Sequence, residues 1–173
     1  MCPCPTGSRS KVVLLCGVAG SGKTTYAKRL EASGYTRLSI DEHIWQHAGR
    51  YGIDYEPQEY ERLQGEAETA LRERLVRLVT DGRDVVVDFS FWQRARRDQY
   101  KSLVERAGGT WRLIYLKVNA DEVRRRLKER AGRFDANAAF PITDQVLEQY
   151  LAGFEEPDGE GEEVIDQDSY RAV

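Results

Sequence analysis

A glycine-rich stretch near the start of the sequence limits the possible folds more than any other feature. Residues 17–24 read GVAGSGKT, which fits the pattern G-x-x-x-x-G-K-[ST]. A short apolar run at residues 12–16 precedes this stretch, and an amphipathic run at residues 22–32 follows it. Because glycine adopts backbone angles that a side chain forbids, such a loop can wrap closely around an anion. The pattern therefore predicts a buried strand, a phosphate-binding loop and a helix, in that order.

The chemistry of this loop indicates which groups bind a nucleotide. Successive N–H groups are expected to point inward as an anion-binding nest, with the positive end of the helix dipole behind them. Lys23 is expected to reach the β- and γ-phosphates of ATP, and the Thr24 hydroxyl to bind Mg²⁺. The alternative is a glycine-rich strand–helix turn with an incidental lysine. The predicted nucleotide-binding residues of the loop are Gly17, Val18, Ala19, Gly20, Ser21, Gly22, Lys23, Thr24 and Thr25.

Short apolar runs alternate with longer amphipathic runs along the rest of the chain. The strand candidates are rich in β-branched and aromatic residues, as central parallel strands are. They lie at residues 11–17, 36–40, 83–90, 111–118 and 162–166. The helix candidates lie at residues 22–32, 57–79, 90–109, 119–130 and 143–154. Ser90 with Gln93, and Asn119 with Glu122, have capping-box spacing at two helix starts. This alternation predicts an α/β fold whose mostly parallel sheet is covered by helices on both faces.

Length and composition are those of an ordinary soluble domain. The 173 residues are 40% hydrophobic and 32% charged, and the formal net charge is −3. We expect a flexible lead-in at residues 1–10 and a single domain at residues 11–173, with a lid at about residues 124–142. The net charge argues against non-specific nucleic-acid binding. No apolar run approaches the roughly 20 residues of a membrane span, and neither a signal peptide nor a disulfide framework is visible, so a cytoplasmic setting is expected.

Two acidic residues lie at the end of a predicted strand or just after one, at the edge of the sheet where the phosphate-binding loop is expected. Asp41 comes just after the strand at residues 36–40, and Asp88 lies in the strand candidate at residues 83–90. A carboxylate at the first position can accept the proton of an attacking hydroxyl, and one at the second can help to hold Mg²⁺. The alternatives are structural: Asp41 suits the positive end of a helix that Ser39 caps, and Asp88 suits a turn-capping role.

An arginine-rich segment at residues 124–133 is the candidate for a closing lid. Arginines on a lid can neutralise charge on a moving phosphoryl group and exclude water. Arg130 and Arg133 are expected to have this role, and Arg126 lies on the same helical face as Arg130. The alternative is a solvated basic face, which we expect for the remaining cations of the segment, Arg124, Arg125 and Lys128.

The pattern as a whole resembles the small P-loop kinases of the AAA_33, or predicted-kinase, group. Relatives include chloramphenicol phosphotransferase-like, zeta-toxin-like and gluconate kinases and the kinase domain of bacterial polynucleotide kinases. The resemblance covers about residues 11–166 and rests on GVAGSGKT, SID at residues 39–41, VVVD at residues 85–88 and the arginine-rich lid. It implies a three-layer α/β/α fold with strand order 2-3-1-4-5, Asp41 as general base, and lid arginines that grip the phosphates.

The sequence departs from this group after Asp88. It reads FSFW, where polynucleotide-kinase relatives tend to have a Thr-Asn pair, and this weakens the case for a nucleic-acid acceptor. The aromatic residues suggest a wall beside the acceptor, although core packing is the alternative. Among the arginines that follow, Arg97 is expected to face the crevice. His43 and Trp45 are candidate acceptor contacts. His43 and His47 have helical spacing for a metal pair, but no third ligand is evident.

These features together predict an ATP- and Mg²⁺-dependent phosphotransferase that acts on a hydroxyl of a small molecule. Asp41, Lys23 and Arg130 are the expected catalytic residues; Thr24 and Asp88 are the expected Mg²⁺ ligands; Arg126 and Arg133 are expected to contact the nucleotide. A nucleic-acid 5′-hydroxyl kinase and a nucleotide-dependent switch or ATPase module are the alternatives. We expect the adenine contacts to come from the lid base and residues 155–163. The acceptor, the choice between ATP and GTP, and the oligomeric state stay open.

Overall fold

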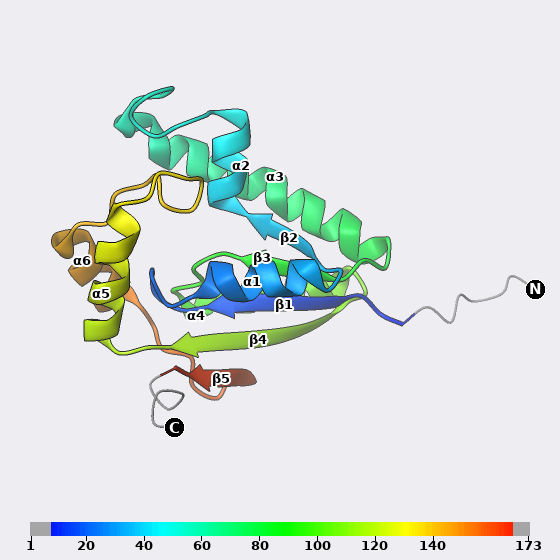
Figure 1. Ribbon diagram of the computed structural model, residues 1–173. Helices are drawn as coiled ribbons and strands as arrows, with labels where there is room; N and C mark the ends of the chain where they lie inside the picture. Colours follow the sequence, from blue (N-terminus) through cyan, green and yellow to red (C-terminus); the bar gives the residue numbers. More distant parts are fainter. Residues whose placement is uncertain (1–7, 168–173) are drawn as a thin grey trace, which may run out of the picture.

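The computed structural model describes residues 8–167, and these contain one five-stranded parallel sheet (Figure 1). The strand order is β2-β3-β1-β4-β5, and every neighbouring pair is parallel. The predicted α/β class and strand order are therefore confirmed. The strands are β1 (Lys11–Cys16), β2 (Thr36–Ser39), β3 (Val85–Asp88), β4 (Thr110–Lys117) and β5 (Glu162–Asp166).

Helices occupy the connections between the strands. Figure 1 shows α5 and α6 at the end of the sheet to which the strand arrows point. None of the described helices combines the length and the apolar character that a bilayer-spanning helix needs. The helices are α1 (Lys23–Ala32), α2 (Ile40–His47), α3 (Tyr60–Thr80), α4 (Arg94–Arg106), α5 (Ala120–Ala131) and α6 (Asp144–Gly153), and a 3₁₀ turn, η1 (Pro57–Glu59), precedes α3.

The alternating side chains of β1 divide the core between the two faces of the sheet. Val12, Leu14 and Cys16 point to the face that packs against α3 and α4. Val13 and Leu15 point to the other face, which packs against α1. All five are fully buried, as expected for a central strand with helices on both sides. The sheet is thus the middle of three layers.

The parallel register brings the ends of three strands to one edge of the sheet. Ser39, the last residue of β2, pairs with Asp88, the last residue of β3. In the next pair, Leu14 of β1 lies opposite Val87. Because parallel strands end at the same edge, the loop after β1, the start of α2 and Asp88 come together there. This edge carries the candidate site.

Local capping signals were predicted correctly at two helices and wrongly at a third. The Ser39 side chain accepts a hydrogen bond from the backbone N–H of Glu42, and Asn119 does the same for Glu122. The predicted capping box of Ser90 with Gln93 is wrong, because α4 begins at Arg94 and Gln93 itself is the N-cap without a side-chain bond. The intervening turn follows β3 directly and belongs to the site.

The structure describes the last three residues of the expected lead-in, residues 8–10. Residues 1–7 of the expected lead-in lie outside the described residues. Ser10, its last residue, is buried and donates a hydrogen bond to the Arg83 carbonyl, while its own carbonyl accepts from Thr110 N–H at 2.9 Å. Ser10 therefore packs against Arg83, which lies just before β3, and against Thr110, the first residue of β4.

Candidate active site

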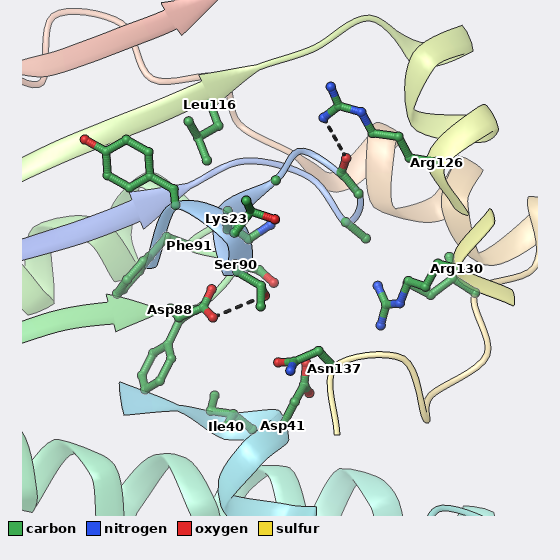
Figure 2. Close-up of a pocket in the computed structure, with 18 of the residues that line it drawn as sticks. Lys23, Ile40, Asp41, Asp88, Ser90, Phe91, Leu116, Arg126, Arg130 and Asn137 are labelled. Atoms are coloured by element: carbon green, nitrogen blue, oxygen red, sulfur yellow. Dashed lines mark hydrogen bonds between the residues drawn. The ribbon is translucent and has the colours of Figure 1, made fainter. Parts of the chain in front are cut away.

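A cavity of about 1370 Å³ lies at the carboxyl edge of the sheet, between the loop after β1, α2, α3 and the lid (Figure 2). It brings together most of the residues that the sequence predicted. Those lining it are Ala19, Gly20, Gly22, Lys23, Thr24, Thr25, Asp41, Asp88, Arg126, Arg130 and Arg133. Gly17, Val18 and Ser21 of the same loop do not line the cavity, because all three residues are buried.

The loop after β1 depends on glycine at two positions. Gly22 precedes α1 with φ +96°, a left-handed conformation that glycine adopts without strain. A Cβ on Gly17 would lie 2.5 Å from Ser21 Oγ and 3.0 Å from the Leu116 carbonyl oxygen, so no side chain fits there. The glycines therefore shape a loop whose N–H groups and following helix start suit an anion.

Lys23 lies folded against this loop. Its Nζ donates hydrogen bonds to the carbonyl oxygens of Gly17 at 2.7 Å and Val18 at 2.9 Å. Burial lowers the Lys23 pKa to about 8, and the nearby carboxylates of Asp88 and Asp41 oppose this effect. The ammonium is thus a poorly solvated cation, and a phosphate anion would give it a stronger partner than the carbonyls do.

Asp88 forms a buried polar cluster with one predicted and one unpredicted partner. Its Oδ2 accepts a hydrogen bond from Thr24 Oγ1 at 3.2 Å. The same oxygen accepts from Arg37 Nη2 at 2.8 Å and Nε at 3.0 Å. The side chains of Asp88 and Arg37 are only 4% and 5% exposed. Sequence reasoning missed Arg37, although a basic residue in the short strand candidate at residues 36–40 was a signal.

The donor set at Asp88 fits Mg²⁺ as phosphotransfer sites hold it. One carboxylate and one hydroxyl oxygen lie side by side, and Mg²⁺ commonly takes few protein ligands with the rest from phosphates and water. Within residues 8–167, no group of three or more acidic, His or Cys side chains is placed to hold a metal on its own. Thr24 and Asp88 therefore fit a metal that arrives with a nucleotide.

Asp41 lies in the first turn of α2 and lines the cavity. Burial raises the pKa of its carboxyl group, and the Arg130 guanidinium is the largest opposing influence. Figure 2 shows the two side chains approaching the cavity from different sides, Asp41 from α2 and Arg130 from α5. Within the described part of the chain, the Asp41 carboxylate makes no hydrogen bond. Asp41 also has the structural position considered in the sequence analysis, because it lies at the positive end of α2, the helix that Ser39 caps.

The three candidate lid arginines differ in their contacts. Arg126 donates to the Gly20 carbonyl at 3.3 Å and pairs with Glu122 at 2.8 Å, so it touches the phosphate loop. Arg133 pairs with Asp135 at the surface. Arg130 forms no ion pair within residues 8–167, and burial lowers its pKa. Arg130 is therefore the lid cation whose guanidinium is most available to a bound anion.

Polar and aromatic contacts hold the lid against α2 and α3. Asn137 accepts a hydrogen bond from Arg37 Nη2 at 3.0 Å and donates one to Glu42 Oε1 at 3.0 Å. Phe140 stacks on Tyr60 with ring centroids 4.5 Å apart. The sequence gave no sign of the Asn137 contact, because it joins residues that lie 100 positions apart.

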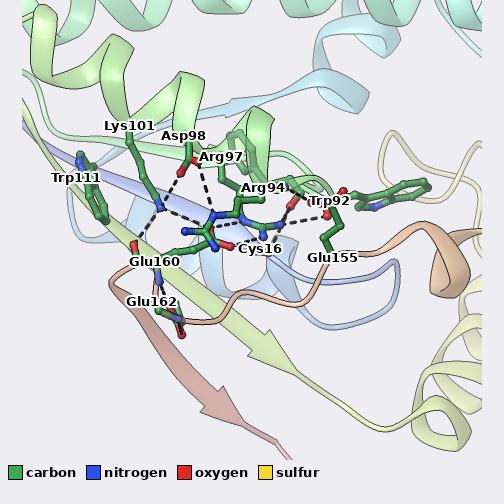
Figure 3. A network of polar contacts seen from close by, with 12 residues as sticks. Cys16, Trp92, Arg94, Arg97, Asp98, Lys101, Trp111, Glu155, Glu160 and Glu162 are labelled. Atoms are coloured by element: carbon green, nitrogen blue, oxygen red, sulfur yellow. Dashed lines mark hydrogen bonds and ion pairs between the residues drawn. The ribbon is translucent and has the colours of Figure 1, made fainter.

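The prediction that Arg97 faces the crevice is wrong. Its side chain is fully buried and pairs with Glu160 through two hydrogen bonds of 2.8 and 2.6 Å (Figure 3). It also donates to the Phe91 carbonyl at 2.9 Å. The adjacent arginine, Arg96, lines the cavity instead. The pattern of three arginines did not reveal which of them had a buried acidic partner.

The aromatic residues after Asp88 have both of the roles considered. Phe89 and Phe91 are 4% and 1% exposed and pack around Tyr100, so they belong to the core. Both also line the cavity, together with Trp92, which packs on Tyr150 with ring centroids 4.3 Å apart. The predicted wall is therefore present, with the core as its backing.

Other expected contacts do not reach the cavity. His43 and Trp45 do not line it, and Trp45 packs on Phe134 of the lid instead. The rings of His43 and His47 stack 4.0 Å apart, and no metal cluster forms around them within the described residues. Residues 155–163 also contribute nothing to the lining, whereas Ile165 and Gln167 beyond them do.

The fold and this site define a P-loop protein with a kinase-like architecture. The profile of the AAA_33 family, described as an AAA domain, matches residues 12–157. The chain therefore belongs to the AAA_33 family. No curated protein matches the sequence.

Solved structures with the same fold include kinases. A proposed kinase from Chloroflexus aurantiacus J-10-fl is 18% identical with a TM-score of 0.71, over 96% of this chain and 92% of that one. A gluconokinase from Sinorhizobium meliloti 1021 is 21% identical, with a TM-score of 0.58 over 91% and 82%. Chaetomium thermophilum Kti12, in complex with ADP-AlF3, is 17% identical, with a TM-score of 0.64 over 91% and 89%. At these identities the likeness establishes the fold alone.

Proposed function

We propose that the protein is a phosphotransferase that moves the γ-phosphate of ATP to a hydroxyl group of a small molecule, with Mg²⁺ as cofactor. The observation that carries this proposal is the place of the Asp41 carboxylate. It lines the same cavity as the phosphate loop and makes no hydrogen bond within the described residues. It is therefore available to accept a proton from an incoming alcohol.

The reaction balances with the residues that line the cavity. The hydroxyl oxygen of the acceptor forms a bond to the γ-phosphorus, and the bond from that phosphorus to the oxygen bridging it to the β-phosphate breaks. A phosphate ester and ADP result. Asp41 takes the proton of the hydroxyl and passes it to water. Lys23 and the N–H groups of the loop hold the β- and γ-phosphates, and Arg130 neutralises charge on the transferring group.

Thr24 and Asp88 would hold Mg²⁺, which supplies positive charge to the phosphates when it is bound. The fold relatives support a nucleotide at this loop, since Kti12 was solved with ADP-AlF3 and gluconokinase is a small-molecule kinase by name. Arg126 and Arg133 complete the proposed nucleotide contacts. We place all of these residues in one domain at residues 11–173 with its lid at 124–142.

The test is acceptor-dependent release of ADP by the purified full chain with ATP and Mg²⁺. A panel of small alcohols should contain members that raise ADP release and appear as phosphate esters by mass spectrometry. Release that no acceptor stimulates, in protein that binds ADP with Mg²⁺, would instead favour a nucleotide-dependent switch. Labelling of a 5′-hydroxyl oligonucleotide in preference to all small alcohols would favour a nucleic-acid kinase.

A further inference from the structure

One part of the cavity wall is distinct from the phosphate loop. We call it the acceptor end. It comes from α2, α3, the turn after β3, the start of α4, the lid and α6, and its residues are Asp41, Tyr60, Gln64, Trp92, Gln93, Arg96, Phe140 and Tyr150. Under the proposed function, the substrate that receives the phosphoryl group binds there. The chemistry of these side chains therefore constrains what the acceptor is.

The acceptor end is aromatic on two sides. Tyr60 of α3 stacks on Phe140 of the lid at 4.5 Å with an interplanar angle of 16°. Trp92, in the turn after β3, packs edge-on against Tyr150 of α6 at 4.3 Å. Each pair joins two different elements that line the cavity. Flat aromatic surfaces of this kind suit the apolar face of a ring.

The phenol groups at this end are neutral hydrogen-bonding groups beside the proposed base. Burial is the main reason that the pKa values of Tyr60 and Tyr150 lie above their usual value, and the Asp41 charge raises both further. Neither hydroxyl makes a hydrogen bond within residues 8–167. Both are therefore available to neutral oxygen atoms of a ligand whose reacting hydroxyl meets Asp41.

The acceptor end offers no uncommitted positive charge. Its only cation, Arg96, forms an ion pair with Glu68 at 2.6 Å. Arg126, Arg130 and Lys23 face the phosphate loop or Asp41, where a triphosphate would engage them. Asp41 itself adds negative charge. An anionic group bound here would lie near carboxylates without a compensating cation of its own, which is costly at a buried site.

Two buried donors at the acceptor end have no partner. Trp92 Nε1 and Arg96 Nε are the buried polar side-chain atoms without a hydrogen bond in the described part of the chain. Both belong to residues that line the cavity. A buried donor without a partner costs about 1–3 kcal/mol, and a bound ligand that turns either side chain toward one of its oxygen atoms would remove that cost. Each of these two N–H groups needs a hydrogen-bond acceptor, and a neutral oxygen atom is sufficient.

From these contacts we propose that the acceptor is an uncharged alcohol built on a ring, whose flat face lies on the aromatic walls and whose other oxygens are neutral. The proposal rests on the proposed function and goes further, because it excludes hydroxy acids, sugar phosphates and nucleotides as preferred acceptors. Asp41 receives the proton of the reacting hydroxyl, and the ring lies between the Trp92–Tyr150 and Tyr60–Phe140 pairs.

The experiment compares matched pairs of alcohols that differ by one carboxylate. Benzyl alcohol is paired with hydroxymethylbenzoate, and cyclohexanemethanol with hydroxymethylcyclohexanecarboxylate. ADP release and the phosphate ester are measured with the full chain, ATP and Mg²⁺. The uncharged member of at least one pair should have a kcat/KM about tenfold or more above that of its carboxylate partner.

Two variants test the reason for this preference. Gln64→Lys adds a cation to the acceptor end and should raise kcat/KM for the carboxylate relative to its uncharged partner by about threefold to tenfold. Gln99→Lys makes the same change at an exposed position of α4 that does not line the cavity, and it should leave that ratio unchanged. Tyr150→Leu should raise KM for the ring alcohol about tenfold without changing ADP affinity, whereas Tyr35→Leu, away from the cavity, should not.

The outcomes separate this inference from the proposed function. A preference of the unaltered protein for the carboxylate members, or for a phosphorylated or nucleic-acid acceptor, overturns the uncharged-ring proposal. Phosphorylation of small molecules would then still support the kinase. If no member of any pair is phosphorylated, the uncharged-ring proposal fails. The proposed function fails as well when no alcohol of the wider panel is phosphorylated by protein that binds ADP with Mg²⁺.

Discussion

Arg37 and Asp88 form a buried ion pair at 2.8 Å, and the same Asp88 oxygen bonds the Thr24 hydroxyl of the phosphate loop. Arg37 also donates to Asn137 of the lid at 3.0 Å. One arginine therefore connects the proposed Mg²⁺ ligand with the segment that closes over it. A metal that binds this oxygen of Asp88 would compete for it with Arg37 and Thr24.

Removing this arginine should destabilise the nucleotide-free protein. Arg37→Met leaves the buried Asp88 charge without its main partner, and such a loss costs about 3–5 kcal/mol. Urea unfolding measures the change. Arg112→Met is the matched control, since Arg112 pairs with Glu163 at a similar 2.7 Å but both side chains are about half exposed, so it should cost under about 1 kcal/mol. Equal losses in the two variants would contradict the assigned role of the buried pair.

Lys23 should lower the stability of the nucleotide-free protein at neutral pH. Its folded pKa of about 8 lies below its ordinary value of 10.5, so the unfolded chain binds more protons between these values. The free energy of unfolding therefore rises as pH increases from about 8 toward 10.5. Below about pH 8 the destabilisation that Lys23 causes has its full size. Lys23→Met should melt higher than the unaltered protein at pH 7, and the difference should shrink across the window.

Nucleotide binding distinguishes this effect from a general gain in stability. ADP with Mg²⁺ should raise the melting temperature of the unaltered protein and have little effect on Lys23→Met. Thermal unfolding with and without the nucleotide measures both. A Lys23→Met protein that still gains the full ADP stabilisation would show that the lysine does not hold the phosphates.

The sequence was sufficient for the features that short-range patterns encode. The glycine loop, the buried strands and the caps at Ser39 and Asn119 each depend on neighbouring residues, and the structure has all of them. The strand order came from the resemblance, because periodicity does not say which strands are neighbours. The cavity placement of Asp41 and Asp88 followed from their positions just after or at the ends of parallel strands.

The errors all concern contacts between distant residues. Arg96 and Arg97 are adjacent in the sequence, and only the position of Glu160, 63 residues beyond Arg97, decides which of them is buried. Ser90 and Gln93 had capping spacing, but tertiary contacts hold the turn after β3 in another conformation. Phe91 there has φ +46°, which spacing along the chain does not reveal.

The buried Arg97–Glu160 pair should be essential for that turn. Arg97→Met leaves the Glu160 carboxylate, which is 1% exposed, with the longer Lys101 contact at 3.5 Å in place of the Arg97 pair. It also removes the donor to the Phe91 carbonyl, and should cost about 3–5 kcal/mol. Arg94→Met, on the exposed side of the same helix, should cost under about 1 kcal/mol. Urea unfolding of the two variants checks this. Similar stability in both would mean that the buried pair contributes little to holding Phe91.

The lid should open more often when its polar contacts are removed. Asn137→Ala deletes the hydrogen bonds to Arg37 and Glu42, so the nucleotide-free lid should be cleaved faster by trypsin after Arg130 and Arg133. Mass spectrometry of the fragments identifies the sites and their rates. Gln145→Ala, an exposed change on α6, is the control and should leave cleavage unchanged. Identical rates in all three proteins would show that Asn137 does not restrain the lid.

Asp41→Asn should separate catalysis from nucleotide binding. The amide keeps the shape of the side chain but cannot take the acceptor proton, so acceptor-dependent turnover should fall by about 10²–10⁴-fold while ADP affinity stays within a few-fold. In the unaltered protein, activity should decline as pH falls through the Asp41 pKa, which burial places above its usual value of 3.8, because the base must be ionised. Asp84→Asn, outside the cavity, should leave turnover unchanged. An Asp41→Asn protein with undiminished turnover would mean that another group, or water, accepts the proton.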